Sequence, residues 1–226
     1  KMSKDNLVND IVEIVKLKYG TEDPPPIVLV GHSLGGALAV HVANVKGANG
    51  IASLVGIVVI DLVEGTALNS LIHMRSIINA RPKSFDSAES AVKWCVRSGM
   101  IRNYKSARMS VPPMFVKQDN GQFAWRTKVL LTEPFWRDWF VGLSDLFLKS
   151  PVSKMLMLAD TDRLDKALTI GQMQGKYEMC IVGCGVGHTL HEDAPKKVAD
   201  KLLHFAERNQ FIKMWALNKK FRLKKK

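Results

Sequence analysis

The fold of this chain is decided by the stretch Ile27-Val28-Leu29-Val30-Gly31-His32-Ser33-Leu34-Gly35-Gly36. Its first four residues are β-branched or leucine, which is typical of a strand buried on both faces of a parallel sheet. A helical pattern starts just past Ser33 and runs to about Val45. Gly31 and Gly35 flank the serine and leave room for the backbone to close sharply. We therefore predict that Ser33 lies on a strained turn between a strand and a helix.

This turn makes Ser33 the candidate catalytic nucleophile. A serine on a strand-to-helix turn of this kind is the nucleophile of many hydrolytic enzymes. The N–H groups that open the following helix point toward it, and the Leu34 N–H is the expected donor to an oxyanion. A G-x-S-x-G string alone is a weak signal, but the flanking strand and helix and the further Gly36 strengthen it. The alternative is a purely structural turn.

Outward from this turn, apolar strand patterns alternate with helical patterns. Strands are expected at 27–30, 54–60, 155–159 and 177–182, and helices at about 3–20, 34–45, 164–173 and 195–208. Such alternation predicts an α/β fold, with a parallel sheet covered by helices on both faces. The stretch from about 64 to 148 is mostly helical in pattern and is predicted to be a cap. We expect one domain over 1–210 and a basic tail over 211–226.

A serine nucleophile needs a histidine base and an acid, expected in the chain order serine, acid, histidine. His188 follows the predicted strand at 177–182 and a glycine-rich turn, and it precedes the last helix. This is the expected place for the base. His191 is the reserve, and its neighbours Glu192 and Asp193 favour a capping or orienting role at the start of the last helix. The remaining histidines lie in the turn itself, in helices or in the cap, namely His32, His41, His73 and His204.

Two aspartates compete for the role of the acid. Asp162 follows the strand just before the histidine's strand, which is the commoner position in folds of this kind. Asp61 ends the strand that follows the strand of the nucleophile. Position alone favours Asp162, and either residue could instead be a solvated or helix-capping aspartate.

Composition and charge argue against a membrane-spanning protein, a zinc site and a disulfide-rich protein. The chain has 226 residues, 46% of them hydrophobic, and no apolar run long enough to cross a bilayer. Cys95, Cys180 and Cys184 lack the spacing of a zinc site or a disulfide framework, so we expect no metal and a reducing cytoplasmic or nuclear compartment. The net charge is +12, of which seven positive charges lie from Lys213 onward, which leaves +5 elsewhere.

The basic tail admits three interpretations. Its apolar residues recur at roughly helical spacing, at Phe211, Met214, Trp215, Leu217 and Phe221. It could form an amphipathic helix on an acidic surface, a solvated terminus or a nuclear-import signal. A nucleic-acid-binding role is disfavoured because the body of the chain lacks basic patches interleaved with aromatic residues.

Several strings make the chain resemble the protein phosphatase methylesterases, a family of the α/β-hydrolase fold. They are VGHSLGGA from Val30, IDLVEGTA from Ile60, RLDK from Arg163, LTIGQMQGK from Leu168, and Gly187-His188 with HEDAP from His191. The resemblance runs from about residue 5 to 210. It implies a serine esterase that removes the methyl ester from the C-terminal leucine of the protein phosphatase 2A catalytic subunit without a cofactor. It also implies Asp61 as the acid, with Asp162 in reserve.

The chain departs from this family at its N-terminal side. Family members carry four more strands and a loop with a second oxyanion donor ahead of the nucleophile, so we expect the first half of the sheet to be missing. Loss of one oxyanion donor lowers the rate by about 10²–10³ in other enzymes. We therefore expect this chain to be weakly active or inactive. The alternatives are a general carboxylesterase or lipase-like hydrolase and a catalytically impaired phosphatase-binding fragment.

Overall fold

A four-stranded parallel sheet forms the centre of the chain. The computed structural model describes residues 2–22, 24–160 and 164–211, together with 213 and 216. The strands are β1 (Ile27–His32), β2 (Leu54–Ile60), β6 (Ser153–Leu158) and β7 (Glu178–Ile181), in the order β1-β2-β6-β7. Each neighbouring pair is parallel. The predicted parallel sheet is confirmed, and β1 is two residues longer than its apolar run.

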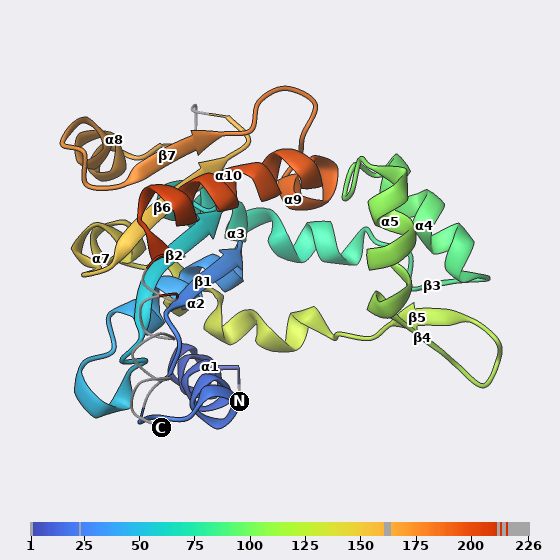
Figure 1. Cartoon of the computed structure of the whole chain (residues 1–226). Coiled ribbons are helices and arrows are strands. Elements are labelled where there is room, and N and C mark those ends of the chain that lie inside the picture. Colours follow the sequence, from blue (N-terminus) through green and yellow to red (C-terminus); the bar gives the residue numbers. More distant parts are fainter. Residues whose placement is uncertain (1, 23, 161–163, 212, 214–215, 217–226) are drawn as a thin grey trace.

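Helices cover both faces of this sheet (Figure 1). Those that pack around one core are α1 (Lys4–Tyr19), α2 (Leu34–Ala43), α3 (Glu64–Asn79), α6 (Trp136–Phe140), α7 (Leu143–Lys149) and α8 (Lys166–Met173). Helices α9 (Leu190–Asp193) and α10 (Pro195–Arg208) pack on the opposite face. A short 3-10 helix, η1 (Gly47–Asn49), precedes β2.

The alternation of side chains along the strands explains the two cores. Ile57 and Val59 of β2 point into the core with α2 and α7, whereas Val58 and Ile60 point into the core with α10. Successive strand residues face opposite sides of a sheet, so a strand covered on both sides must be apolar throughout. This is why Leu54–Ile60 contains no polar side chain.

The cap lies beside the sheet domain (Figure 1) and has its own hydrophobic core. Its helices are α4 (Ala88–Arg97), α5 (Tyr104–Ser110) and the 3-10 helix η2 (Pro112–Met114). A further 3-10 helix, η3 (Val129–Phe135), packs on the core of the sheet domain. The cap also contains a small antiparallel sheet of β3 (Ser84–Phe85), β5 (Phe123–Trp125) and β4 (Phe115–Lys117). The sequence pattern did not indicate this sheet, because strands of two or three residues are too short to show a period of two.

The edge of the sheet at β1 is partly exposed, and the chain beyond α10 packs back on the sheet domain. Within the described residues β1 pairs only with β2, and its Val30 is 49% exposed. At the other end, Phe211 was assigned to the tail but is buried against Phe205, with ring centroids 5.6 Å apart. Most of the predicted tail lies outside the described residues.

In the part of the chain that the structure describes, no helix is long and apolar enough to cross a membrane.

Candidate active site

Ser33 lies on the turn between β1 and α2. Its backbone has φ 52° and ψ −120°, an unfavourable region for a residue with a side chain. The turn is held by the Ser33 N–H, which donates to the Ile60 carbonyl of β2 at 3.0 Å, and by the Ser33 carbonyl, which accepts from the N–H groups of Gly36 and Ala37. The strain at Ser33 is therefore imposed by the sheet on one side and the helix on the other.

Two of the three glycines are required by close backbone approach. A Cβ on Gly31 would lie 2.1 Å from the Gly35 carbonyl oxygen, and a Cβ on Gly36 would lie 2.9 Å from both the Gly31 carbonyl oxygen and Val59 Cγ1. A Cβ on Gly35 would meet no atom within 4 Å. The steric reason that the sequence analysis gave for Gly35 is therefore wrong. The close contact arises at Gly31 and Gly36.

Asp61 follows β2 directly and lies almost completely buried. Its N–H donates to the Met157 carbonyl at 2.7 Å, which holds the residue at φ 50°. One carboxylate oxygen, Oδ1, accepts from the Ala159 N–H at 3.2 Å. The other oxygen, Oδ2, lies 2.8 Å from His188 Nδ1. The structure thus brings Asp61 and His188 together, while Asp162 lies outside the described residues.

His188 reaches this carboxylate from the loop after β7. Its side chain is 52% exposed, whereas the Asp61 side chain is fully buried. A carboxylate accepts hydrogen bonds, so Nδ1 of His188 carries the proton in the neutral ring and Nε2 is left as an acceptor. This is the tautomer that a general base beside a serine requires.

Ser33, Asp61 and His188 line one pocket of about 500 Å³. The rest of its lining comes mainly from α3 and is largely apolar, with Leu62, Val63, Thr66, Ala67, Ser70, Leu71, Met74, Ile77 and Phe140. Leu34 occupies the first position of α2. Its N–H therefore has no acceptor within the helix and can donate beside Ser33.

The His32 ring contacts the rings of both His188 and His191, each in a tilted arrangement. The His32 ring centroid lies 4.5 Å from that of His188 and 4.6 Å from that of His191. The His32 Nε2–H donates to the His188 carbonyl at 2.8 Å, so His32 holds the backbone of the candidate base. The expected capping role of His191 is wrong, because the N-cap of α10 is Ala194 and no side chain caps it.

The pKa of His32 yields a prediction about stability. Burial, and then the positive charge that His188 and His191 can carry, lower this pKa from 6.5 to about 4, against the opposing effects of the bond to the His188 carbonyl and the Asp61 charge. Between about pH 4 and 6.5 the unfolded chain therefore binds more protons than the folded chain, and stability falls as the pH falls. We expect wild type to lose about 1 kcal/mol more than His32→Gln between pH 7.5 and 5, allowing for partial exposure. Urea unfolding at both pH values measures the difference, and equal losses in the two proteins would contradict it.

Asp193 connects the cap to the loop that carries His188, a role that its position in the sequence did not indicate. Its Oδ1 accepts from the Arg102 N–H at 2.6 Å, and its Oδ2 accepts from the Gly187 N–H at 2.7 Å. The Arg102 side chain in turn donates to the Val186 carbonyl at 3.0 Å. One carboxylate therefore fixes the residue before His188 to the backbone of the cap.

Two neighbouring contacts reinforce this connection. The Thr189 hydroxyl donates to the Met100 carbonyl at 2.6 Å, and the Ser110 hydroxyl donates to Glu192 Oε1 at 2.7 Å. Acidic residues at the start of a helical segment are usually helix caps, so their sequence position favoured capping. A contact with residues some 90 positions away leaves no signal in local sequence.

We expect Asp193→Ala to slow the reaction of Ser33 with a fluorophosphonate by up to about 10²-fold. The loss of both acceptors frees Gly187 and lets His188 move away from its position beside Asp61, and a displacement of about 1 Å can have an effect of this size. The matched control is Asp200→Ala, an exposed residue on α10 whose side chain pairs only with Lys196 among the described residues. Equal labelling rates for the two variants would contradict a positioning role.

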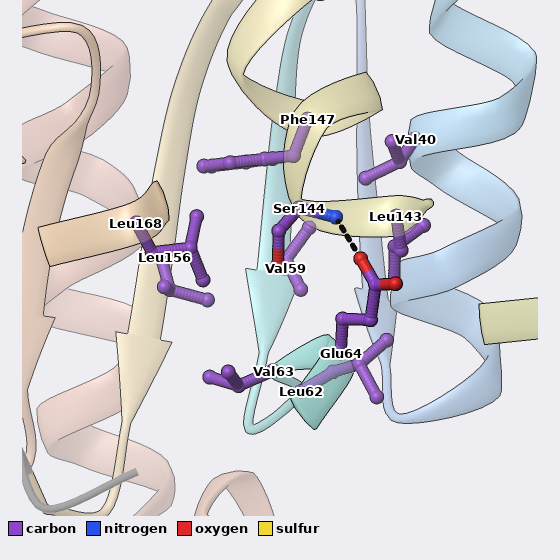
Figure 2. Close-up of a pocket in the computed structure, with 10 residues that line it drawn as sticks. All are labelled: Val40, Val59, Leu62, Val63, Glu64, Leu143, Ser144, Phe147, Leu156 and Leu168. Carbon is purple, nitrogen blue, oxygen red and sulfur yellow. Dashed lines mark hydrogen bonds between the residues drawn. The ribbon is translucent and has the colours of Figure 1, made fainter. Parts of the chain in front are cut away.

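Two other acidic residues of the strings that carry the family resemblance, Glu64 and Asp165, hold helices in place and do not line the Ser33 pocket. Glu64 accepts from the Ser144 N–H at 2.8 Å (Figure 2) and from the Gly142 N–H at 2.7 Å, and thereby caps the start of α7. The Ser144 hydroxyl donates to Asp165 Oδ2 at 2.5 Å, and Asp165 Oδ1 accepts from the Leu168 N–H at the start of α8. These bonds join α3, α7 and α8 beneath the candidate site.

The match to a family model agrees with this fold. The model of the alpha/beta hydrolase family covers residues 5–201, and the chain belongs to that family. Solved structures similar to it include E-2-(acetamidomethylene)succinate hydrolase, with a TM-score of 0.70 and 17% identity over 92% of this chain and 75% of that one. An esterase from M. tuberculosis has a TM-score of 0.65 and 18% identity over 91% of this chain and 69% of that one. At these identities the likeness concerns the fold.

Among curated proteins, the chain is similar to protein phosphatase methylesterase 1. The protein from Schizosaccharomyces pombe is 46% identical over 210 residues, which cover 92% of this chain and 60% of that protein. The human protein is 40% identical over an alignment 253 residues long, and this alignment covers 93% of this chain and 64% of that protein. The resemblance drawn from the sequence is confirmed, and the chain spans somewhat less than two thirds of these relatives.

Proposed function

We propose that this chain carries the catalytic residues of a serine esterase, with Ser33 as nucleophile, His188 as base and Asp61 as acid. The observation that carries the proposal is the 2.8 Å contact between His188 Nδ1 and a buried Asp61 oxygen in the pocket that Ser33 also lines. Membership of the α/β-hydrolase family and similarity to named methylesterases support it.

The proposed reaction has two halves. Ser33 Oγ attacks the ester carbonyl while His188 Nε2 takes the serine proton, and the Leu34 N–H donates to the developing oxyanion. The C–O bond to the alcohol then breaks, and His188 gives the proton to the departing alcohol. Water, deprotonated by His188, attacks the acyl-serine and releases the carboxylate and Ser33. Asp61 holds the imidazole tautomer and stabilises its charged form throughout, and the reaction requires no metal or organic cofactor.

The proposed substrate is the methyl ester of the C-terminal leucine of the protein phosphatase 2A catalytic subunit, which is then also the partner. The names of the relatives support a phosphatase methyl ester. The apolar face of α3 that lines the pocket, including Leu71, Met74 and Ile77, suits an aliphatic residue next to the ester. We propose that the protein is located in the cytoplasm, the nucleus or both.

Fluorophosphonate labelling of wild type and Ser33→Ala tests the proposal. We expect labelling of wild type that is lost in the variant, with the same circular dichroism spectrum for both proteins. Hydrolysis of a peptide that ends in leucine methyl ester, in preference to p-nitrophenyl acetate, identifies a methylesterase rather than a general carboxylesterase. A folded wild-type sample that neither labels nor hydrolyses would refute the catalytic proposal, and capture of the phosphatase by that sample would indicate a binding fragment.

A further inference from the structure

A second groove of about 430 Å³ lies at the far end of α3, where the cap begins. It is formed by the end of α3 and the residues after it, by β5 and by η3, which run close together in Figure 1. Its lining residues are Ile78, Asn79, Arg81, Pro82, Lys83, Ala124, Trp125, Thr127, Lys128, Val129, Leu130 and Leu131. Leu131 is 73% exposed, which is unusual for a leucine beside a hydrophobic groove.

The charges of this groove all have one sign. Arg81, Lys83 and Lys128 line it, and none of its lining residues is acidic. The Arg81 guanidinium lies 5.3 Å from the centre of the Trp125 ring. Within the described residues it forms no ion pair with a carboxylate. Burial lowers the pKa of Arg81, which shows that the surroundings disfavour its charge.

The nearby acidic side chains are engaged elsewhere. Glu133 of η3 pairs with Arg75, and Asp86 accepts from the Gln122 side-chain amide. A half-buried guanidinium without an anionic partner is unfavourable, and contact with an aromatic ring offsets only part of that penalty. The groove therefore combines an apolar floor with a cation that has no counter-charge among the residues that the structure describes.

We propose that this groove binds an acidic peptide segment of a partner protein, with a carboxylate at Arg81 and a neighbouring apolar side chain against Trp125 and Leu131. A guanidinium recognises a carboxylate through two parallel hydrogen bonds, and the contact with the Trp125 ring limits the positions of the Arg81 guanidinium. Lys83 and Lys128 favour further acidic residues on either side. The proposal does not depend on catalysis, because no residue of this groove lines the Ser33 pocket.

The test is an array of ten-residue synthetic peptides in which glutamate and leucine occupy varied positions, with a matching array that has glutamine in place of glutamate. The best peptide is then titrated by fluorescence anisotropy against wild type, Arg81→Gln, Lys128→Gln and the control Lys197→Gln. Lys197 is exposed on α10, at a distance from the groove.

We expect the glutamate peptides to be preferred and the affinity to fall about tenfold or more in Arg81→Gln and less in Lys128→Gln, with no change in Lys197→Gln. The melting temperature of Arg81→Gln should not fall, because that variant removes an unpaired charge. Equal binding of glutamate and glutamine peptides, unchanged affinity in both groove variants, or stronger binding of a single-stranded oligonucleotide than of the best peptide would overturn the proposal.

Discussion

Asp61→Asn is expected to lower the rate of ester hydrolysis and of fluorophosphonate labelling by about 10⁴-fold, the effect known for loss of the acid in a serine triad. The local geometry explains why. The Ala159 N–H needs an acceptor, so the asparagine oxygen takes the place of Oδ1 and its NH₂ group faces His188 Nδ1. A donor at that position forces the proton of the neutral imidazole onto Nε2, and His188 can then no longer take the proton of Ser33.

The fold should survive this change, which makes the variant informative. Asparagine tolerates a positive φ, and the backbone at Asp61 has φ 50°. Circular dichroism and the melting temperature check the fold, and Asp162→Asn serves as the matched control. A loss of activity in Asp162→Asn with near wild-type activity in Asp61→Asn would show that the position-based preference for Asp162 was right.

Gly31→Ala is expected to destabilise the chain by about 4 kcal/mol or more, which is exceptional for a single methyl group. The new Cβ would lie 2.1 Å from the Gly35 carbonyl oxygen and 2.5 Å from the Gly36 nitrogen. These are backbone atoms of the first turn of α2, so the clash can be relieved only by moving the helix away from the strand. Urea unfolding followed by circular dichroism measures the loss.

Gly35→Ala is the matched control for this prediction. A Cβ at Gly35 meets no atom within 4 Å, and alanine is the better helix former, so stability should stay the same or rise by up to about 1 kcal/mol. Equal stability of the two alanine variants would show that the turn relaxes without resistance. A large loss of stability in Gly35→Ala would contradict the open space that the structure shows around a Cβ at this position.

Much of the fold could be predicted because it depends on local pattern. The run Leu54–Ile60 and the helix Pro195–Arg208 occur within the bounds expected from hydrophobicity and proline alone. The turn at Ser33 was predictable for the same reason, since the strand, glycines and helix that form it are contiguous. The cap sheet was not predictable, because its strands have only two or three residues and β3 pairs with β5 across the intervening cap helices.

Local sequence was enough to predict the α/β alternation, the turn that carries Ser33, and the place of His188 after the last strand. Each depends on neighbours within a few residues, where backbone preference and hydrophobic period act directly. Only the tertiary structure placed Asp61 against His188 and Asp193 between the cap and Gly187. Those pairs lie side by side because parallel strands end at one edge of the sheet and the cap folds back on it. Hydrogen bonding between residues far apart in the chain depends on that packing, which has no counterpart in local sequence.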